Sequence, residues 1–104
     1  MSTGPDDLVL RDNPAELRYE ALRGGTVLAE IRYRTEPGLV VLVHTDVAPS
    51  AEGTGVGSTL VKAALDDIRE RGLRVVPFCP FVAAYIRRHP EYRDLVGRDP
   101  ATPG

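Results

Sequence analysis

The feature that most constrains this chain is a glycine-rich segment over residues 52–58, EGTGVGS, at which the periodicity of the apolar residues changes. Before it, apolar and polar residues alternate with period two, which is typical of strands with one covered face. After it, apolar residues recur at the spacing of an amphipathic helix. Glycines let a backbone turn tightly, and the first N–H groups of a helix attract anions. The segment therefore predicts an anion site between a strand and a helix, with a solvated turn as the plainer alternative.

Four strands are predicted before this segment. They cover residues 8–12, 17–22, 27–34 and 39–47. Glycine and proline residues between the last three predict hairpin connections. The run over 39–43 is apolar at every position, which favours an interior strand covered on both faces. The first half is therefore predicted to be an antiparallel sheet whose most buried strand comes last.

The second half predicts a helix, a strand and a second helix. These cover residues 60–71, 73–78 and 81–88, with one further turn over 91–96. Gly72 ends the first helix, and Pro80 can begin the second. Pro77 has no N–H to donate, so we expect the short strand to splay at that point. This order predicts an α+β domain: a mainly antiparallel sheet with one strand–helix–strand crossover.

The composition limits the classes of protein to consider. A chain of 104 residues fits one domain, which we place over residues 8–96, with flexible ends over 1–7 and 97–104. One cysteine allows no internal disulfide and suits the reducing cytoplasm. Thirteen basic and fifteen acidic residues argue against nucleic-acid binding. No apolar run approaches the length of a membrane span, and no signal peptide is visible, so no membrane association is expected.

Three phosphate-binding templates can be compared with the glycine-rich segment. The P-loop requires a lysine directly after the last glycine, and Lys62 comes a turn too late. The dinucleotide fingerprint requires a third glycine where Ser58 or Leu60 stands. The third template, Q/R-x-x-G-x-G/A, is matched by Gly55 and Gly57, with Glu52 at the Q/R position. It is the acyl-CoA loop of the GNAT-type N-acetyltransferases.

The chain resembles a small, minimal subfamily of these enzymes at three separated blocks. They are HTDV at 44–47 together with the glycine-rich segment, CPFV at 79–82 and HPEY at 89–92. The resemblance covers residues 8–96. It implies a three-layer α/β GNAT fold with a truncated C-terminus, and acetyl-CoA held in a gap between the fourth and fifth strands. By position it implies the cofactor-binding residues Asp46, Val47, Gly53, Thr54, Gly55, Val56, Gly57, Ser58 and Cys79. A carboxylate at residue 52 would repel a pyrophosphate, so the contacts are expected from the backbone.

His44 is the first candidate for catalysis, because histidine can accept a proton near neutral pH. Strand alternation places it on the same face as Leu42 and Asp46. A histidine on a buried strand is more often a hydrogen-bonded core residue, and this alternative stays open.

Cys79 and Tyr85 are the other catalytic candidates. Cys79 precedes a helix whose N–H groups can favour a thiolate, so it can form an acetyl-cysteine intermediate or simply line the pocket. The resemblance implies an Asn after the fifth strand and, seven residues later, a Tyr that protonates the CoA thiolate. Cys79 stands at the Asn position and Tyr85 one residue short of the other, so Tyr85 is either the acid or core packing. We expect His89 and Tyr92 to cap the fold.

The leading functional hypothesis is an acetyl-CoA-dependent N-acetyltransferase that acts by direct attack of a primary amine on the thioester. A protein lysine, a protein N-terminus or a small amine is open as the acceptor. The alternatives are a non-catalytic acyl-CoA-binding or protein-interaction module, and a structural domain whose glycine turn binds nothing. No metal site is predicted, because the histidines and the cysteine lack closely spaced partners. We expect a monomer or a weak homodimer.

Overall fold

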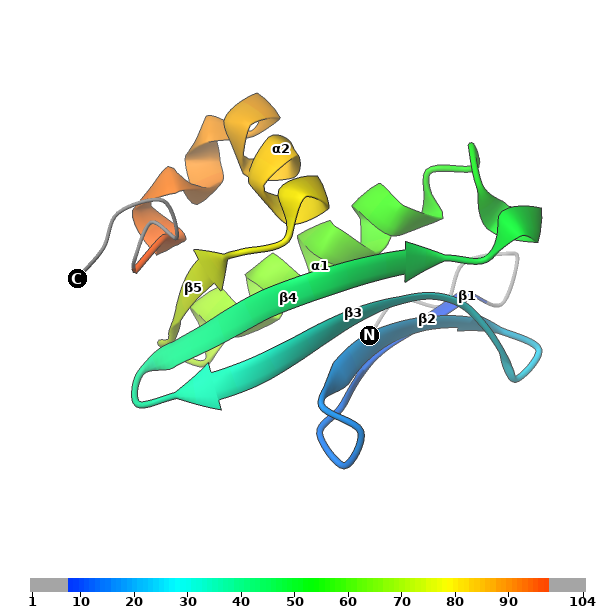
Figure 1. Cartoon of the computed structure of the whole chain (residues 1–104), viewed down its shortest axis with the longest axis horizontal. Helices are drawn as coiled ribbons and strands as arrows, with labels where there is room; N and C mark the ends of the chain where they lie inside the picture. Colours follow the sequence, from blue (N-terminus) through cyan, green and yellow to red (C-terminus); the bar gives the residue numbers. More distant parts are fainter. Residues whose placement is uncertain (1–7, 98–104) are drawn as a thin grey trace.

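Five strands form one sheet in which their spatial order follows their order in the chain (Figure 1). The computed structural model describes residues 8–97. The strands are β1 (Leu8–Asn13), β2 (Arg18–Arg23), β3 (Thr26–Glu36), β4 (Leu39–Val47) and β5 (Arg74–Pro77). β1 to β4 are antiparallel neighbours, and β5 lies parallel to β4. The predicted α+β architecture, with one crossover, is confirmed.

Two α-helices and two 3-10 turns complete the fold over residues 8–97. They are α1 (Val56–Glu70), α2 (Pro80–Arg88) and the turns Pro49–Ala51 and Pro90–Leu95. α1 forms the crossover from β4 to β5, and Gly72 follows it in a left-handed conformation, as predicted for a helix stop. α1 begins earlier than the predicted residue 60, because its first turn takes in part of the glycine-rich segment. No helix within residues 8–97 is long and apolar enough to cross a membrane.

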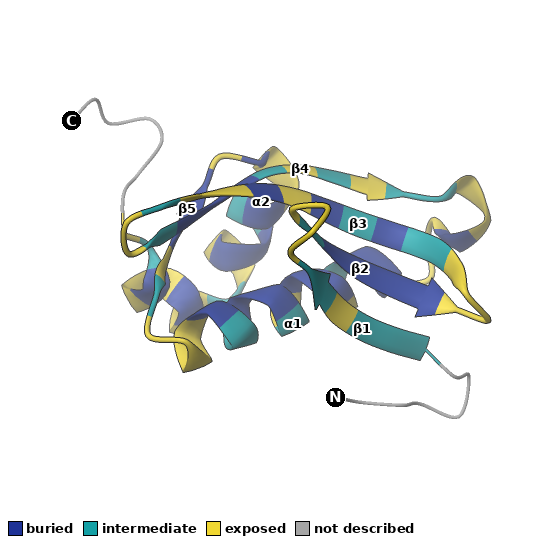
Figure 2. Ribbon diagram, turned by 90° about the horizontal axis from the view of Figure 1, so that it is seen from below, coloured by how far each residue is buried: buried dark blue, intermediate teal, exposed yellow. Residues whose placement is uncertain are grey.

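The core lies between α1 and one face of the sheet. In Figure 2 the helix runs beneath the sheet, and buried positions alternate along β3. The core residues of β3 are Ala29, Ile31 and Tyr33, and they cluster with the buried residues of both helices. The described residues therefore form a mixed sheet with helices packed against it, in agreement with the fold that the resemblance implied. Gly97 closes this unit by donating its N–H to the carbonyl of Val75 at 2.9 Å. The rest of both predicted flexible ends lies outside the described residues.

A bulge in β4 changes which face its residues occupy. Arg32 on β3 is opposite His44, but the next residue, Tyr33, is opposite Leu42, so Val43 has no partner. Leu42 therefore lies in the core, whereas the His44 side chain is 59% exposed on the other face. The prediction that His44 shares a face with Leu42 was wrong, because one extra residue shifts the alternation. The alternative of a buried core histidine is excluded as well.

β4 and β5 separate after four pairs. The register runs from Leu39 opposite Arg74 to Leu42 opposite Pro77 and ends there. The N–H of Cys79 then donates to the carbonyl of Leu42 at 2.8 Å, and α2 begins at the next residue. Among the described residues, the second half of β4 has no strand beside it on this edge. The splay predicted at Pro77 is therefore present.

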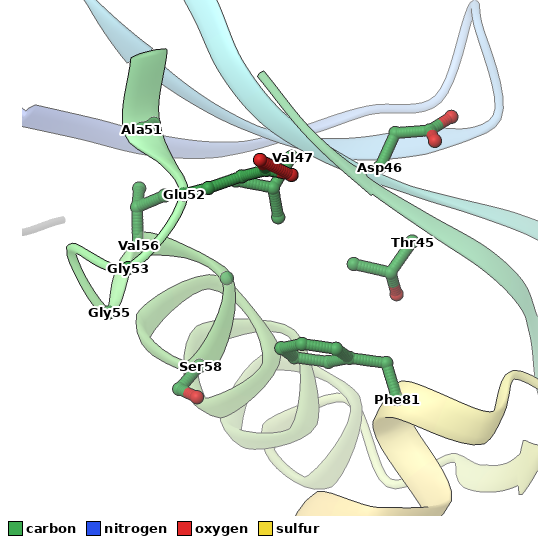
Figure 3. Close-up of a pocket in the computed structure, with 11 residues that line it drawn as sticks. Thr45, Asp46, Val47, Ala51, Glu52, Gly53, Gly55, Val56, Ser58 and Phe81 are labelled. Atoms are coloured by element: carbon green, nitrogen blue, oxygen red, sulfur yellow. The ribbon is translucent and has the colours of Figure 1, made fainter. Parts of the chain in front are cut away.

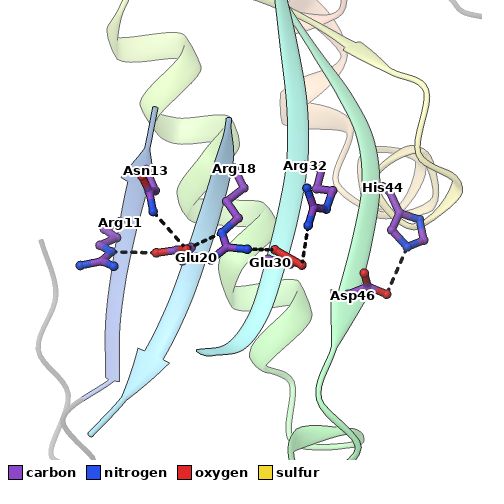
Figure 4. Close-up of polar contacts among 8 residues, drawn as sticks. All are labelled: Arg11, Asn13, Arg18, Glu20, Glu30, Arg32, His44 and Asp46. Atoms are coloured by element: carbon purple, nitrogen blue, oxygen red, sulfur yellow. Dashed lines mark hydrogen bonds and ion pairs between the residues drawn. The ribbon is translucent and has the colours of Figure 1, made fainter. Parts of the chain in front are cut away.

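The face of the sheet opposite α1 carries ion pairs in place of an apolar layer (Figure 4). Glu20 of β2 is 1% exposed, yet it accepts hydrogen bonds from Arg11 Nε at 2.9 Å, Asn13 Nδ2 at 3.3 Å and Arg18 Nε. Arg18 also donates to Glu30 Oε2 at 2.8 Å. Burial raises the pKa of Glu20, but the three hydrogen bonds outweigh it and hold the pKa below its ordinary value.

Replacing this carboxylate should weaken the fold in a pH-dependent way. We expect Glu20→Gln to lower the free energy of unfolding at pH 7 by about 1–3 kcal/mol, because three donors lose a charged acceptor. The lowered pKa means that the stabilisation is complete above the unfolded value of about 4.3 and is lost as the pH falls through the folded pKa. Urea unfolding at pH 7 and pH 3 measures both effects.

The exposed carboxylate Glu16 is the matched control, and Glu16→Gln should change stability by less than about 0.5 kcal/mol. An equal difference between wild type and Glu20→Gln at both pH values would contradict the electrostatic explanation.

Candidate functional site

A cleft of about 560 Å³ lies where β4 separates from β5 (Figure 3). It is bounded by the end of β4, the glycine-rich segment and the start of α2. The lining residues are Thr45, Asp46, Val47, Ala51, Glu52, Gly53, Gly55, Val56, Gly57, Ser58 and Phe81. The cleft thus combines an unpaired strand edge with a helix N-terminus.

The turn that leads into α1 depends on two glycines. Gly53 and Gly55 have φ values of 79° and 83°, in the left-handed region where other residues are strained. Gly55 is the N-cap of α1 and offers no side chain to the helix, and its carbonyl accepts the N–H of Thr59 at 3.0 Å. The N–H groups before Thr59 have no partner within the helix and bear its positive dipole end. This end of the cleft is therefore suited to an anion.

Glu52 lines the same end of the cleft. In Figure 3 its side chain extends toward Val47. Its negative charge opposes an anion there, so the backbone N–H groups supply the attraction. That backbone contacts, rather than the side chain of residue 52, hold a ligand here stays a prediction.

Gly57 allows a close approach between α1 and α2. A Cβ atom at this position would lie 3.0 Å from Cζ of Phe81 and 3.2 Å from Cγ2 of Val47. The Phe81 ring therefore reaches from α2 to the first turn of α1 and forms part of the cleft wall. The sequence showed the glycine and the phenylalanine but not that they meet.

Cys79 lies behind the cleft rather than in its lining. The residue is 2% exposed, and its Sγ is 3.2 Å from Oγ1 of Thr45, which does line the cleft. This contact joins β4 to the start of α2 where the strands have separated. Thr45 was missed at the sequence level, because a lone threonine in a strand carries no motif.

His44 and Asp46 form a pair on the exposed face of β4 (Figure 4). Nε2 of His44 is 3.1 Å from Oδ1 of Asp46, and both side chains are more than half exposed. Asp46 also lines the cleft, whereas His44 does not. The imidazole therefore stands beside the cleft on its solvent side, where a second molecule can reach it.

A second groove, of about 360 Å³, adjoins the cleft at Ser58. It runs between α1 and α2 and is lined by Ser58, Thr59, Lys62, Tyr85, Arg88 and His89. Lys62 pairs with Asp66 at 2.8 Å, whereas Arg88 forms no ion pair within residues 8–97. The groove is thus lined by basic side chains, and it shares Ser58 with the cleft.

Tyr85 occupies this groove and not the cleft. Its ring stacks on His89 with centroids 3.9 Å apart, and it packs in the core beside Tyr92. Burial raises its pKa, so the phenol stays protonated. Its assignment as the acid stays a prediction, as do those of His44 and Cys79. Thr54 lies in the turn but outside the cleft lining, with its hydroxyl donating to the carbonyl of Ala51.

The comparisons with known proteins agree on one family. A family model of GCN5-related N-acetyltransferases matches residues 18–95. The NMR structure of a GCN5-like candidate N-acetyltransferase from Staphylococcus aureus is similar, with a TM-score of 0.67 and 28% identity, over 92% of this chain and 90% of that one. No group of three or more residues suited to hold a metal ion occurs in the described part of the chain.

Two longer proteins share the fold. A GNAT family acetyltransferase from Brucella melitensis, solved in complex with acetyl-CoA, has a TM-score of 0.54 and 25% identity over 73% of this chain. The ribosomal-protein-S18-alanine N-acetyltransferase of Escherichia coli has a TM-score of 0.59 over 75% of this chain, and at 16% identity it supports the fold alone. This chain spans 54% of the length of each.

The contact between Gly57 and Phe81 predicts an energetic coupling. Gly→Ala inside a helix ordinarily stabilises it by about 0.5–1 kcal/mol. In wild type we expect Gly57→Ala to lose this gain, because the new methyl group meets the Phe81 ring. In a Phe81→Ala background the ring is absent and only the contact with Val47 remains, so part of the gain should return. A double-mutant cycle in urea should therefore show a coupling of at least about 0.5 kcal/mol, and additive effects would contradict the contact.

Proposed function

Because the chain belongs to the GCN5-related N-acetyltransferase family, we propose that it transfers the acetyl group of acetyl-CoA to a primary amine by direct attack. The observation that carries the proposal is the cleft itself, which places an anion-attracting helix N-terminus beside an unpaired strand edge. A CoA thioester has the matching parts, a diphosphate followed by a chain with two amide groups.

Acetyl-CoA, the donor substrate, lies along the cleft with its diphosphate at the glycine-rich turn and its pantetheine arm along β4. Its diphosphate binds the backbone N–H groups at the start of α1, next to Gly53 and Gly55. The two amides of its pantetheine arm hydrogen-bond to the free edge of β4 near Val47, as an added strand would. The nucleotide end continues into the second groove, where Lys62 and Arg88 supply positive charge.

The reaction needs only the two substrates and proton transfers. The amine nitrogen uses its lone pair to attack the thioester carbonyl carbon, a C–N bond forms and the C–S bond breaks. CoA leaves as a thiolate and takes a proton, and the amine nitrogen loses one. Hydrogen-bond donors that face the carbonyl oxygen stabilise the negative charge that develops there. The donors in this cleft are the backbone N–H groups of β4.

His44 accepts the amine proton in this proposal, with Asp46 orienting its ring. The pair stands on the solvent side of β4, so an acceptor amine can reach it without displacing the donor. Cys79 supports the wall through Thr45 and carries no acetyl group, because its sulfur is buried and outside the cleft lining. Intact-protein mass spectrometry after incubation with acetyl-CoA should then show no adduct on Cys79.

Calorimetry with acetyl-CoA, followed by a thiol-release assay over a panel of amines, tests the proposal. We expect binding and acceptor-dependent release. Gly55→Ala should weaken binding about tenfold, because alanine is strained at φ 83° and adds a methyl group to the anion end of the cleft.

Gly24→Ala is the matched control, since Gly24 also has a positive φ and open space around it but lies in the β2–β3 hairpin. It should bind acetyl-CoA like wild type. Wild-type protein that binds without acceptor-dependent release would favour the non-catalytic module, and no binding at all would overturn both.

The proposed role of His44 predicts that its removal lowers turnover but leaves the affinity for acetyl-CoA unchanged. His44→Ala should lower kcat about 100-fold or more, because general-base catalysis is lost, while the Kd for acetyl-CoA stays within about twofold. Arg34→Ala, an exposed change on the neighbouring strand β3, is the control and should leave both unchanged. Unchanged turnover in His44→Ala would remove this residue from the mechanism.

A further inference from the structure

The polar side chains on the face of the sheet opposite α1 form two rows that cross neighbouring strands (Figure 4). In the first row, residues from β1 to β4 lie opposite one another in the register, in the order Arg11, Glu20, Glu30 and Asp46. The second row is formed in the same way by Asn13, Arg18, Arg32 and His44. One row is therefore mainly acidic, the other is mainly basic, and ion pairs connect them.

Each carboxylate on β2 and β3 has two cationic partners. Glu20 pairs with Arg11 and Arg18. Glu30 pairs with Nη1 of Arg18 at 2.8 Å and with Nη2 of Arg32 at 3.7 Å. Because arginine stays protonated in proteins, these two negative charges are balanced by the protein itself.

Asp46, at the β4 end of the acidic row, has a single basic partner within residues 8–97. Its Oδ1 lies 3.1 Å from Nε2 of His44, whereas its Oδ2 has no hydrogen-bond or ion-pair partner there. The imidazole must be neutral to accept a proton from the amine, and a neutral ring leaves the carboxylate charge unbalanced. Glu30 lies directly opposite Asp46, and like charges in this arrangement repel. A further cation beside Asp46 would therefore stabilise the reactive state.

Space for such a cation lies beside Asp46. A pocket of about 290 Å³ at the end of β4 is lined by Val27, Leu28, Ala29, Glu30, Asp46, Val47 and Ala48. It shares Asp46 and Val47 with the cleft. In Figure 3 the side chains of Asp46 and Thr45 project to opposite sides of β4. A molecule held by the Asp46 carboxylate therefore approaches the cleft from the side of β4 opposite to Thr45.

We propose that this pocket binds a second positive charge of the acceptor beside Asp46, while the reacting amine lies at His44. The inference rests on the proposed function and names its acceptor class. The acceptor is a primary amine that carries a further ammonium or guanidinium group, as in a diamine or in a protein lysine next to a basic residue. The reacting nitrogen is uncharged when it attacks, so only the second charge can stay paired with Asp46. The apolar part of the pocket lining suits the methylene chain between the two nitrogens.

The test compares 1,4-diaminobutane with 4-amino-1-butanol, in which a hydroxyl group replaces one ammonium group. Acetyl transfer is measured by thiol release at low ionic strength, where surface charges are least screened, and kcat/KM is counted per amino group. We expect wild type to prefer the diamine about three- to fivefold, the upper range for an ion pair at an exposed site. The peptides acetyl-Lys-Arg-amide and acetyl-Lys-Gln-amide repeat the comparison for a protein lysine and show which source supplies the second charge.

Three variants assign the preference to one carboxylate. Asp46→Asn should abolish the preference, and Asp46→Glu, which keeps the charge, should retain it. Glu70→Gln is the control for net charge and should also retain it, because Glu70 is exposed on α1 and lines neither the cleft nor this pocket. Loss of the orientation of His44 would lower turnover of both amines equally, so the ratio isolates the binding of the second charge.

Where a variant turns over too slowly for a rate ratio, the Kd values of the two amines for the CoA-bound protein, measured by NMR titration, give the same ratio. Equal kcat/KM for the diamine and the amino alcohol in wild type would overturn the acceptor assignment and leave acetyl transfer intact. So would a preference that survives in Asp46→Asn or is lost in Glu70→Gln. The absence of thiol release with every amine would overturn the proposed function and this inference with it.

Discussion

The separation of β4 from β5 after Leu42 is the constraint on which the candidate site depends. Pro77 has no N–H for the ladder, and the N–H of Cys79 closes the strand pair by bonding to Leu42. α2 begins immediately afterwards and is anchored in the core, so it cannot lie along β4 as a strand would. The second half of β4 is therefore left with a free edge, and the cleft lies along it.

The helices shape this opening from both ends. The left-handed conformation of Gly55 starts α1 so that its first N–H groups face the cleft. Gly57, in the first turn, lets the Phe81 ring cross from α2. The contact between Thr45 and Cys79 closes the far end. The site thus combines an anion-attracting helix N-terminus with an apolar wall, which suits a ligand with an anionic group and an uncharged arm.

The sequence predicted the elements well because each depends on a local pattern. Alternating and helical spacing of apolar residues predicted the strands and helices in their order. The glycine and proline residues between them predicted the connections and the anion-attracting turn. The sequence pattern placed His44 on the wrong face of β4, because nothing local marks the bulge at Val43. A valine at this position fits an unbroken strand as well as a bulged one. The sequence pattern also did not show that Thr45 and Phe81 line the cleft. Neither residue type indicates a site unless its neighbours in the fold are known.

The sequence by itself determined the α+β class, the family resemblance, the splay at Pro77 and the glycine turn at the start of α1. Only the tertiary structure decided on which face of β4 His44 lies. It also decided that Phe81 forms part of the cleft wall and that Cys79 lies behind the cleft. The physical reason is distance along the chain. Gly57 meets Phe81, and Thr45 meets Cys79, across more than twenty residues, and such contacts arise from the packing of whole elements rather than from any local pattern.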